Sequence, residues 1–153
     1  MLLTARIRVR TYELDSFGHV NNAVYLQYFE EARGEYLRLL GLSFEDFSRV
    51  NTQFVITEAH VRYVASAHYG DTLLIPGEIA ELRPASVLFT YRILRDETLI
   101  AEGETRGAIL SATTGRPVRI PEPFKSAFQA QNKTNRDSAR FALEETGTSS
   151  EIA

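Results

Sequence analysis

The chain has 153 residues, 44% of them hydrophobic and 24% charged, which suits one globular domain with a single buried core. Its formal net charge is -3, its lysines and arginines form no cluster, and it has no cysteine. Nucleic acid or an anionic membrane is therefore not expected as the main partner, and disulfides, cysteine nucleophiles and thiolate metal sites are excluded. The N-terminus lacks the continuous hydrophobic run of a signal peptide, and no window approaches membrane-spanning length, so we expect a cytoplasmic protein.

The first expected elements are a strand and a long helix. Residues 5–12, ARIRVRTY, alternate between hydrophobic side chains and arginines, which predicts a half-buried strand. After a loop at 13–21, hydrophobic residues recur at spacings of four and three, which predicts a helix over 22–40 with one hydrophobic stripe: Tyr25, Phe29, Ala32, Tyr36 and Leu39. The charged residues of this helix lie largely away from the stripe: Glu30, Glu31, Arg33, Glu35 and Arg38. We expect Asn21 or Asn22 to cap its start and Gly41 to take a left-handed conformation after its end.

The rest of the domain is expected to consist mainly of strands. A short helical turn at 43–49 precedes predicted strands at about 53–66, 71–82, 86–96 and 98–112. The last two form a hairpin around Asp96–Glu97, and Pro76–Gly77 suggests a bulge or an edge position. Short connections favour antiparallel pairing, so one helix against one antiparallel sheet predicts a two-layer α+β domain.

The C-terminal part has a different composition. A short helix is expected to start at Phe124–Phe128, and the chain becomes polar with few aromatic residues from Gln131 onward. We therefore predict a domain over 1–130 and a tail over 131–153 that is disordered or loosely attached, with a helical stretch at 136–145.

Several common kinds of site are not indicated. The sequence has no G-x-S-x-G nucleophile elbow, no phosphate-binding P-loop and no dinucleotide-binding glycine motif. His60 and His68 would lie roughly 26 Å apart in an extended stretch at 3.3 Å per residue, so they cannot share a metal within one chain. We expect both to be surface or interface histidines.

The segment ELDSFGHVNNAVYLQYFEEAR, residues 13–33, concentrates polar residues at the start of the long helix. Each has a structural explanation: Asp15 in an Asx-turn, His19 as a hydrogen bonder, Asn21 or Asn22 as a cap and Tyr25 in the core. Together they indicate more, because the free amides and dipole of a helix N-terminus favour a developing oxyanion. A carboxylate beside such a point serves as general base or nucleophile, which is enough for acyl transfer to water.

The run DSFGHVNNAVY, residues 15–25, continues into YFEEAR and resembles the signature of hot-dog-fold acyl-CoA thioesterases. It is most similar to the 4-hydroxybenzoyl-CoA thioesterase-like group, and VRYVASAHYGDTL, residues 61–73, resembles that group's second landmark. The resemblance covers about residues 4–124. It implies a hot-dog fold, in which a five-stranded antiparallel sheet wraps one long α-helix. It also implies a homodimer joined through sheet edges, with the active site at the interface, and often a dimer of dimers, that is, a homotetramer.

The resemblance also implies roles for individual residues. Asp15 would be the catalytic carboxylate and the backbone N–H of Asn22 the oxyanion donor, with Gly18 and His19 shaping the turn between them. The substrate side would include Asn21, Tyr25 (or plain core packing for it) and, as a secondary candidate, Glu58. No metal or redox cofactor is implied. The phosphates of CoA need basic residues near the cleft, for which the sequence offers Arg62, Arg83 and Arg92.

The function that follows is hydrolysis of an acyl thioester to a free acid and CoA or a carrier-protein thiol. A hot-dog enoyl-CoA hydratase or dehydratase, which also uses an Asp and a His on one loop, is an alternative. A non-catalytic acyl-CoA-binding module on the same fold is another. Variation around residues 19–22 is linked to different acyl groups in this family, so the 4-hydroxybenzoyl group is not assumed to be the substrate.

Overall fold

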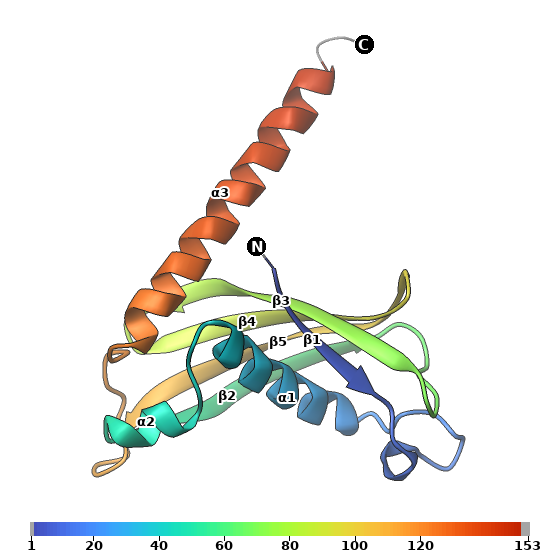
Figure 1. Ribbon diagram of the computed structural model, residues 1–153, viewed down its shortest axis with the longest axis horizontal. Helices are drawn as coiled ribbons and strands as arrows, with labels where there is room; N and C mark the ends of the chain where they lie inside the picture. The colour runs from blue at the N-terminus through green and yellow to red at the C-terminus, as the bar shows by residue number, and fades with distance from the viewer. Residues whose placement is uncertain (1, 151–153) are drawn as a thin grey trace.

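The computed structural model describes residues 2–150, and the side chains of residues 2–137. One sheet curves around a long helix, which confirms the predicted two-layer α+β architecture (Figure 1). The strands are β1 (Leu3–Arg8), β2 (Thr52–Tyr63), β3 (Thr72–Arg83), β4 (Ser86–Arg95) and β5 (Thr98–Ser111). The helices are the short 3-10 helix η1 (Thr11–Glu13), α1 (Val24–Leu39), α2 (Glu45–Arg49) and α3 (Phe124–Ser150).

The sheet is antiparallel with the strand order β1-β3-β4-β5-β2, so β1 and β2 form its two edges. The predicted hairpin between β4 and β5 is confirmed, with Arg95 paired to Thr98 and the intervening Asp96 at φ 53. The expectation of a bulge or edge position at Pro76–Gly77 is wrong. β3 has neighbours on both sides, Pro76 lies opposite Thr4 of β1, and the register shift falls between Ile79 and Glu81.

Gly77 is small for a packing reason. A Cβ at this position would collide with the ring of Tyr36 on α1. The Tyr36 hydroxyl donates a hydrogen bond to the Ile75 carbonyl oxygen at 2.6 Å, which holds the ring against β3. The glycine therefore allows the Tyr36 ring of α1 to lie directly against β3.

The hydrophobic stripe of α1 is confirmed for four of its five predicted members, and the fifth, Leu39, is 48% exposed. Leu37 is buried in its place. The helix turns into the chain reversal at Gly41, which has φ 77, and the Leu42 N–H bonds back to the Leu37 carbonyl at 2.8 Å. The reversal draws Leu37 inward and leaves Leu39 outside.

Arg33 also departs from the prediction that it points away from the core. Only 6% of this residue is exposed. Its Nη1 donates to the Tyr91 hydroxyl at 3.2 Å and to Thr105 Oγ1 at 3.4 Å. The sheet supplies hydroxyl acceptors to the guanidinium, and the buried face of α1 is therefore wider than its hydrophobic stripe.

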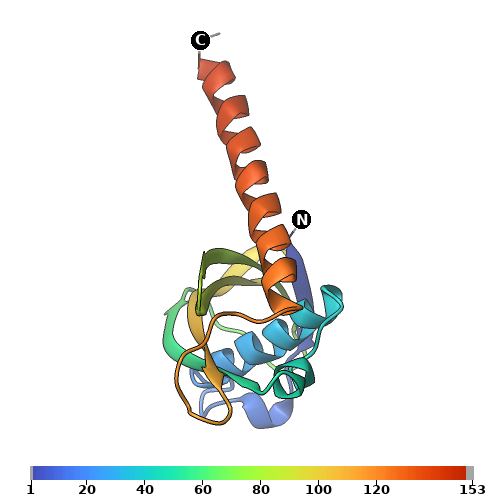
Figure 2. The ribbon, with the colours of Figure 1, turned by 90° about the vertical axis from the view of Figure 1, so that its left-hand side faces the viewer.

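The predicted boundary at residue 130 falls inside α3, which runs unbroken from Phe124 and includes the stretch 136–145. Phe124 stacks on Phe47 with ring centroids 3.7 Å apart. Gln131 and Asn132 are buried, and Asn132 Nδ2 donates to the Ile79 carbonyl at 3.1 Å. A disordered or loosely attached tail is thus wrong for these first residues; beyond them the helix leads away from the body (Figures 1 and 2). Residues 151–153 of the predicted tail lie outside the described residues.

No helix in the described part of the chain, α3 included, is long and apolar enough to cross a membrane.

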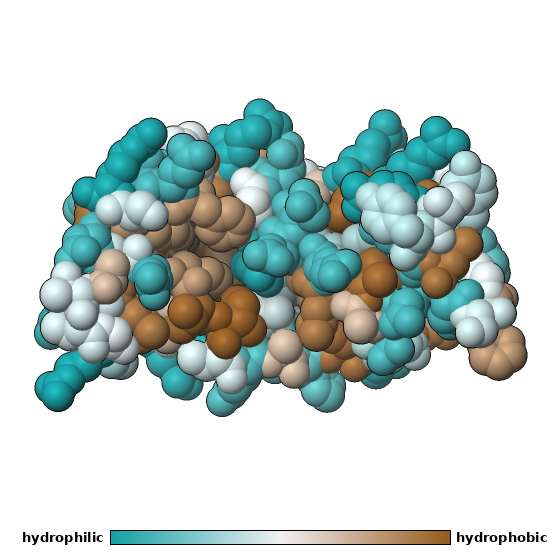
Figure 3. Space-filling model, turned by 90° about the horizontal axis from the view of Figure 1, so that it is seen from below, coloured by the Kyte–Doolittle hydropathy of each residue, from teal (hydrophilic) through white to brown (hydrophobic). Residues whose placement is uncertain are grey.

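Hydrophobic side chains are also exposed along and near the β2 edge. Ile56 is 40% exposed, Tyr63 49% and Val64 47%, and Leu26 on α1 is 43% exposed. On the face shown in Figure 3, hydrophobic residues gather in groups between hydrophilic ones, and a hollow opens among them. An edge strand with exposed hydrophobic residues is a surface on which another chain can pair.

Candidate active site

Two loops meet at one corner of the molecule, on the right in Figure 1. The first, residues 14–23, leads from η1 to α1, and the second, residues 64–71, joins β2 to β3. His19 and His68 pair as an isolated antiparallel bridge, and the Val20 N–H donates to the Ala67 carbonyl at 2.9 Å. The two segments that the sequence singles out are therefore in direct contact.

Asp15 organises the first loop, as its Asx-turn interpretation predicts. Its Oδ1 accepts hydrogen bonds from the Phe17 N–H at 2.8 Å and from the His19 N–H at 3.1 Å. Gly18 completes the turn with φ 79. Among the described residues, Oδ2 accepts no hydrogen bond, so one carboxylate oxygen holds the loop and the other is available to a ligand.

The start of α1 differs from the prediction. The N-cap is Ala23, without a side-chain capping bond, so the expectation that Asn21 or Asn22 caps the helix is wrong. Asn21 Oδ1 accepts from the Ala23 N–H at 2.9 Å and thereby closes a turn just before the helix. The Asn21 side chain therefore bonds to the N–H of the N-cap residue itself and not to the free N–H groups of the first helical turn.

Asn22 is exposed, and its backbone carbonyl and its backbone N–H differ in their hydrogen bonding. Its carbonyl accepts a hydrogen bond from the Tyr63 hydroxyl at 2.8 Å. Within the described residues, its N–H has no hydrogen-bond partner. A free, exposed N–H just before a helix N-terminus is the group that an oxyanion site requires.

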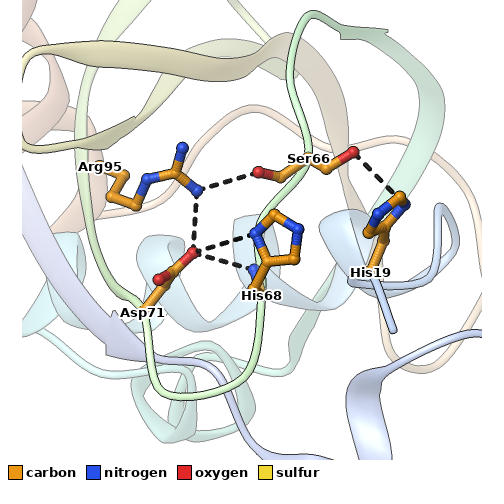
Figure 4. A network of polar contacts seen from close by, with 5 residues as sticks. All are labelled: His19, Ser66, His68, Asp71 and Arg95. Carbon is orange, nitrogen blue, oxygen red and sulfur yellow. Dashed lines mark hydrogen bonds and ion pairs between the residues drawn. The ribbon is translucent and has the colours of Figure 1, made fainter. Parts of the chain in front are cut away.

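His19 is the centre of the contact with the second loop (Figure 4). Its Nδ1 lies 3.4 Å from Ser66 Oγ, and its ring meets the His68 ring edge-on with centroids 5.1 Å apart. Asp71 Oδ2 accepts from the His68 N–H and from Arg95 Nη1, both at 2.9 Å.

Arg95 and Asp71 hold the second loop in place. Arg95 Nη1 also donates to the Ser66 carbonyl at 3.0 Å, so one arginine ties both ends of the loop. Burial would raise the pKa of Asp71, but hydrogen bonds from the His68 backbone and from Arg95 outweigh it and lower that pKa. Asp71 is therefore a charged anchor of the loop.

The sequence interpretation did not identify four residues as part of the site: Ser66, His68 and Asp71 of the second loop, and Arg95 of β4, which binds that loop. The resemblance of residues 61–73 to a family landmark was the available signal. His68 is exposed as predicted, but its ring also contacts the site. His60 stays apart on β2, opposite Glu104, and among the described residues no three His, Asp or Glu side chains are grouped to hold a metal ion.

Tyr25 and Glu58, both predicted to lie on the substrate side, are found in different surroundings. Tyr25 is 3% exposed and lies below the site, where its ring contacts Tyr28 and Tyr63. Burial raises the pKa of its hydroxyl. Glu58 points to solvent from β2, with Arg106 Nε 3.9 Å from its Oε2, so within one chain the structure does not bring it to the loop.

Glu13 is buried at the start of the first loop and supports it. Nothing in the sequence pattern distinguishes it from an exposed acidic residue in a loop. It is 4% exposed, and its Oε1 accepts from the Arg10 N–H at 2.7 Å and from the Tyr28 hydroxyl at 3.0 Å. Burial would raise the pKa of Glu13, but the hydrogen bonds from Arg10 and Tyr28 outweigh it and hold that pKa below its usual value. Its carbonyl accepts from the Asn21 N–H at 2.9 Å, which fixes the approach to α1.

Comparison with known families shows which class of protein this chain belongs to. The family model of the Thioesterase-like superfamily matches residues 9–128. The chain belongs to this superfamily. The motif at residues 15–25 predicts this class of protein, so the predicted family is confirmed.

Individual members of the superfamily support this placement. The chain is 30% identical over 123 residues to the acyl-CoA thioesterase YbgC of Haemophilus influenzae, covering 80% of this chain and 90% of the relative. It is 32% identical over 123 residues to the acyl-acyl carrier protein thioesterase ATL3 of Arabidopsis thaliana, covering 80% of this chain but only 65% of that relative's length. A hypothetical protein of Thermus thermophilus, TT1821, has the same fold with a TM-score of 0.79 and 33% identity over 84% of this chain and 98% of its own. The predicted hot-dog fold is confirmed.

Proposed function

We propose that this chain is an acyl-CoA thioesterase, which hydrolyses an acyl thioester to a free acid and CoA. The single observation that carries this proposal is the free Asn22 N–H beside a loop in which Asp15 keeps one carboxylate oxygen available. The relatives named as thioesterases act on thioesters of CoA or of acyl carrier protein.

In the proposed reaction the thioester carbonyl oxygen binds the Asn22 N–H at the start of α1. Asp15 either takes a proton from the attacking water or attacks the carbonyl carbon itself. The tetrahedral intermediate carries its negative charge on the oxygen that faces the Asn22 amide. When it collapses, the carbon–sulfur bond breaks and the leaving thiolate takes up a proton. If water attacked, the acid is released in this step; if Asp15 attacked, water then hydrolyses the acyl–Asp15 anhydride, which releases the acid and restores the carboxylate. Gly18 and His19 keep the turn in shape, and Asn21 and Tyr25 border the acyl group.

We further propose that two chains pair through the β2 edges, and that dimers associate into tetramers. The exposed hydrophobic residues Ile56, Tyr63 and Val64 support this edge as the interface. Tyr63 also donates to the Asn22 carbonyl, so pairing at this edge acts directly on the oxyanion site. In the dimer the partner's β2 would approach this site, which is where Glu58 would take part. Cytoplasmic location stays a prediction.

The test is a panel of saturated acyl-CoA substrates of different lengths, followed by thiol release, with an enoyl-CoA as the matched substrate. Thiol release from the saturated substrates is the expected result. Addition of water to the enoyl-CoA without thiol release would replace the thioesterase by a hydratase. Binding without either reaction would leave an acyl-CoA-binding module.

A further inference from the structure

Arg95, the last residue of β4, is bonded to the second loop at two places (Figure 4). Its Nη1 donates to Asp71 Oδ2 at 2.9 Å and to the Ser66 carbonyl at 3.0 Å. Because both bonds come from one nitrogen, the guanidinium joins two separate positions of the loop. The Arg95 side chain is only 31% exposed, so these bonds are partly shielded from solvent.

The second loop is held differently at its ends and in its middle. The middle, from Ser66 to His68, is held from the side of β4 by Arg95 and by Asp71, whose Oδ2 accepts the His68 N–H at 2.9 Å. Loss of Arg95 would therefore loosen the middle of the loop and leave its ends attached. The ends are fixed by backbone hydrogen bonds of 2.9 to 3.2 Å: Val64 and Ala65 donate to the Ile100 carbonyl, and Gly70 donates to the Val9 carbonyl.

The middle of the second loop is also the part that meets the first loop. Ser66 Oγ lies 3.4 Å from His19 Nδ1, and the His68 ring meets the His19 ring edge-on. The Ala67 carbonyl accepts the Val20 N–H at 2.9 Å. The position of His19 therefore depends on the middle of the second loop.

His19 is in turn coupled to the carboxylate of Asp15. Its N–H donates to Asp15 Oδ1 at 3.1 Å, and its carbonyl accepts the Asp15 N–H at 2.7 Å. A shift of His19 thus changes the direction in which Asp15 Oδ2 points. A displacement of about 1 Å at a reacting group can lower a rate by roughly a hundredfold.

Tyr25 lies close enough to Arg95 and to Asp15 for both charges to act on its hydroxyl. Burial has the largest effect on the pKa of this hydroxyl and raises it. A hydrogen bond with the Ala67 backbone and the positive charge of Arg95 lower that pKa, whereas the negative charge of Asp15 raises it. Arg95 and Asp15 therefore belong to one electrostatic environment.

We propose that Arg95 is a positioning residue for the proposed hydrolysis. It keeps the middle of the second loop against His19 and thereby fixes the direction of the Asp15 carboxylate. The ion pair with Asp71 alone would serve stability, whereas the bond to the Ser66 carbonyl holds the residue whose hydroxyl faces His19. This inference rests on the proposed function and adds to it a residue that lies outside both loops.

The experiment compares Arg95→Met with Arg95→Lys on the acyl-CoA that the wild type hydrolyses fastest. Methionine keeps an unbranched stem and removes the donors, so we expect kcat to fall about tenfold or more while KM changes little. Lysine carries three N–H groups on one nitrogen and can bond to both acceptors, so it should recover most of kcat. Thermal unfolding checks that both variants are folded.

The matched control is Arg49→Met at the end of α2. Arg49 Nη1 pairs with Asp46 Oδ1 at 2.7 Å, and Asp46 Oδ2 accepts the Ser43 N–H at 2.9 Å. An arginine and an aspartate thus hold a loop N–H here as well, but α2 lies at the opposite end of the molecule from the site (Figure 1). This variant should change neither kcat nor KM.

Asp71→Asn tests the same link from the other side of the ion pair. Asparagine keeps an oxygen for the His68 N–H and removes the charge that Arg95 binds, so kcat should fall here too. Because both changes break one network, combining it with Arg95→Met should lower kcat no further than the slower single variant. If Arg95→Met does not fold, kcat of Asp71→Asn decides the inference in its place.

Several results would overturn the inference. One is a folded Arg95→Met variant with the kcat of the wild type, and another is an equal loss in Arg49→Met. A loss confined to KM would make Arg95 a residue that binds substrate, and a lysine variant as slow as the methionine variant would remove the two bonds as the cause.

Failure of the proposed function is a separate result. If the wild type releases thiol from no acyl-CoA, the proposed function fails, and NMR spectra decide whether Arg95 acts on His19. A shift of the His19 ring signals in Arg95→Met but not in Arg49→Met supports that link, and unchanged His19 signals overturn it.

Discussion

The two oxygens of Asp15 have separate tasks in this structure. Oδ1 accepts the Phe17 and His19 N–H groups and so fixes the loop, while Oδ2 is left for the reaction. Replacement by asparagine keeps an oxygen acceptor for the turn and removes the negative charge. The residue therefore allows its structural and catalytic roles to be separated.

For Asp15→Asn we expect thiol release to fall by at least about two orders of magnitude, as for the loss of a base or nucleophile. The melting temperature should stay close to that of the wild type because the turn is retained. Steady-state thiol release and thermal unfolding measure the two effects. Near-normal turnover in this variant would remove Asp15 from the proposed mechanism.

Glu13 shows how a buried acid supports a neighbouring loop. For Glu13→Gln we expect a loss of about 1–3 kcal/mol in the free energy of unfolding at pH 7, since charge-assisted hydrogen bonds to Arg10 and Tyr28 are weakened. The folded-state pKa of Glu13 is lowered, so its stabilisation is present above the usual value of 4.5 and is lost as the pH falls through the folded-state pKa. The difference between wild type and variant should therefore shrink on acidification.

Denaturant unfolding at neutral and acidic pH measures this dependence. Glu35→Gln is the control, since Glu35 pairs with Arg38 on the exposed face of α1 and a solvent-exposed pair contributes little. A Glu13→Gln variant as stable as the control at neutral pH would show that the cluster does not hold the loop.

At the scale of elements, the packing of the Tyr36 ring of α1 on the sheet depends on one glycine of β3. For Gly77→Ala we expect a loss of about 1–3 kcal/mol in the free energy of unfolding, because the added methyl group meets the Tyr36 ring. Chemical denaturation measures it.

The matched control is Gly34→Ala on α1, where the nearest atom to an added methyl group is the flexible Phe44 side chain at 3.3 Å. Alanine is also the better helix former, so this variant should be neutral or more stable. Equal stability of the two variants would contradict the close packing of Tyr36 on β3.

At the scale of the whole molecule, the two edges of the sheet have different surfaces. β1 carries the exposed Arg6 and Arg8, whereas β2 carries exposed hydrophobic residues. Charged side chains on an edge strand disfavour pairing with another strand, so the contrast favours the β2 edge for the proposed dimer.

For Ile56→Lys we expect the proposed dimer to dissociate, because a charge is placed on the β2 edge. Thiol release should fall with it, since Tyr63 of the same strand contacts Asn22. Analytical ultracentrifugation over a range of concentrations measures the first effect. Val50→Lys is the control, since Val50 is also 40% exposed but precedes β2. A wild-type chain that is monomeric and fully active would overturn the dimer.

The sequence by itself determined the features that local interactions encode. The spacing of hydrophobic residues predicted α1, the glycine after it predicted the left-handed turn at Gly41, and Asp96–Glu97 predicted the hairpin. The contiguous motif at residues 15–25 also predicted the family and the turn built by Asp15. These features depend on neighbours a few positions apart, which a pattern in one chain records.

Only the tertiary structure decided the features that depend on partners distant in the sequence. Burial of Arg33 requires Tyr91 and Thr105 on the sheet, and the contact of His19 with Ser66 requires two loops 47 residues apart to meet. Packing of Asn132 against β3 likewise carries α3 across the boundary predicted at residue 130. Such contacts are set by how the sheet curves around α1, because each side chain finds its partner only after strands far apart in the chain have been brought together.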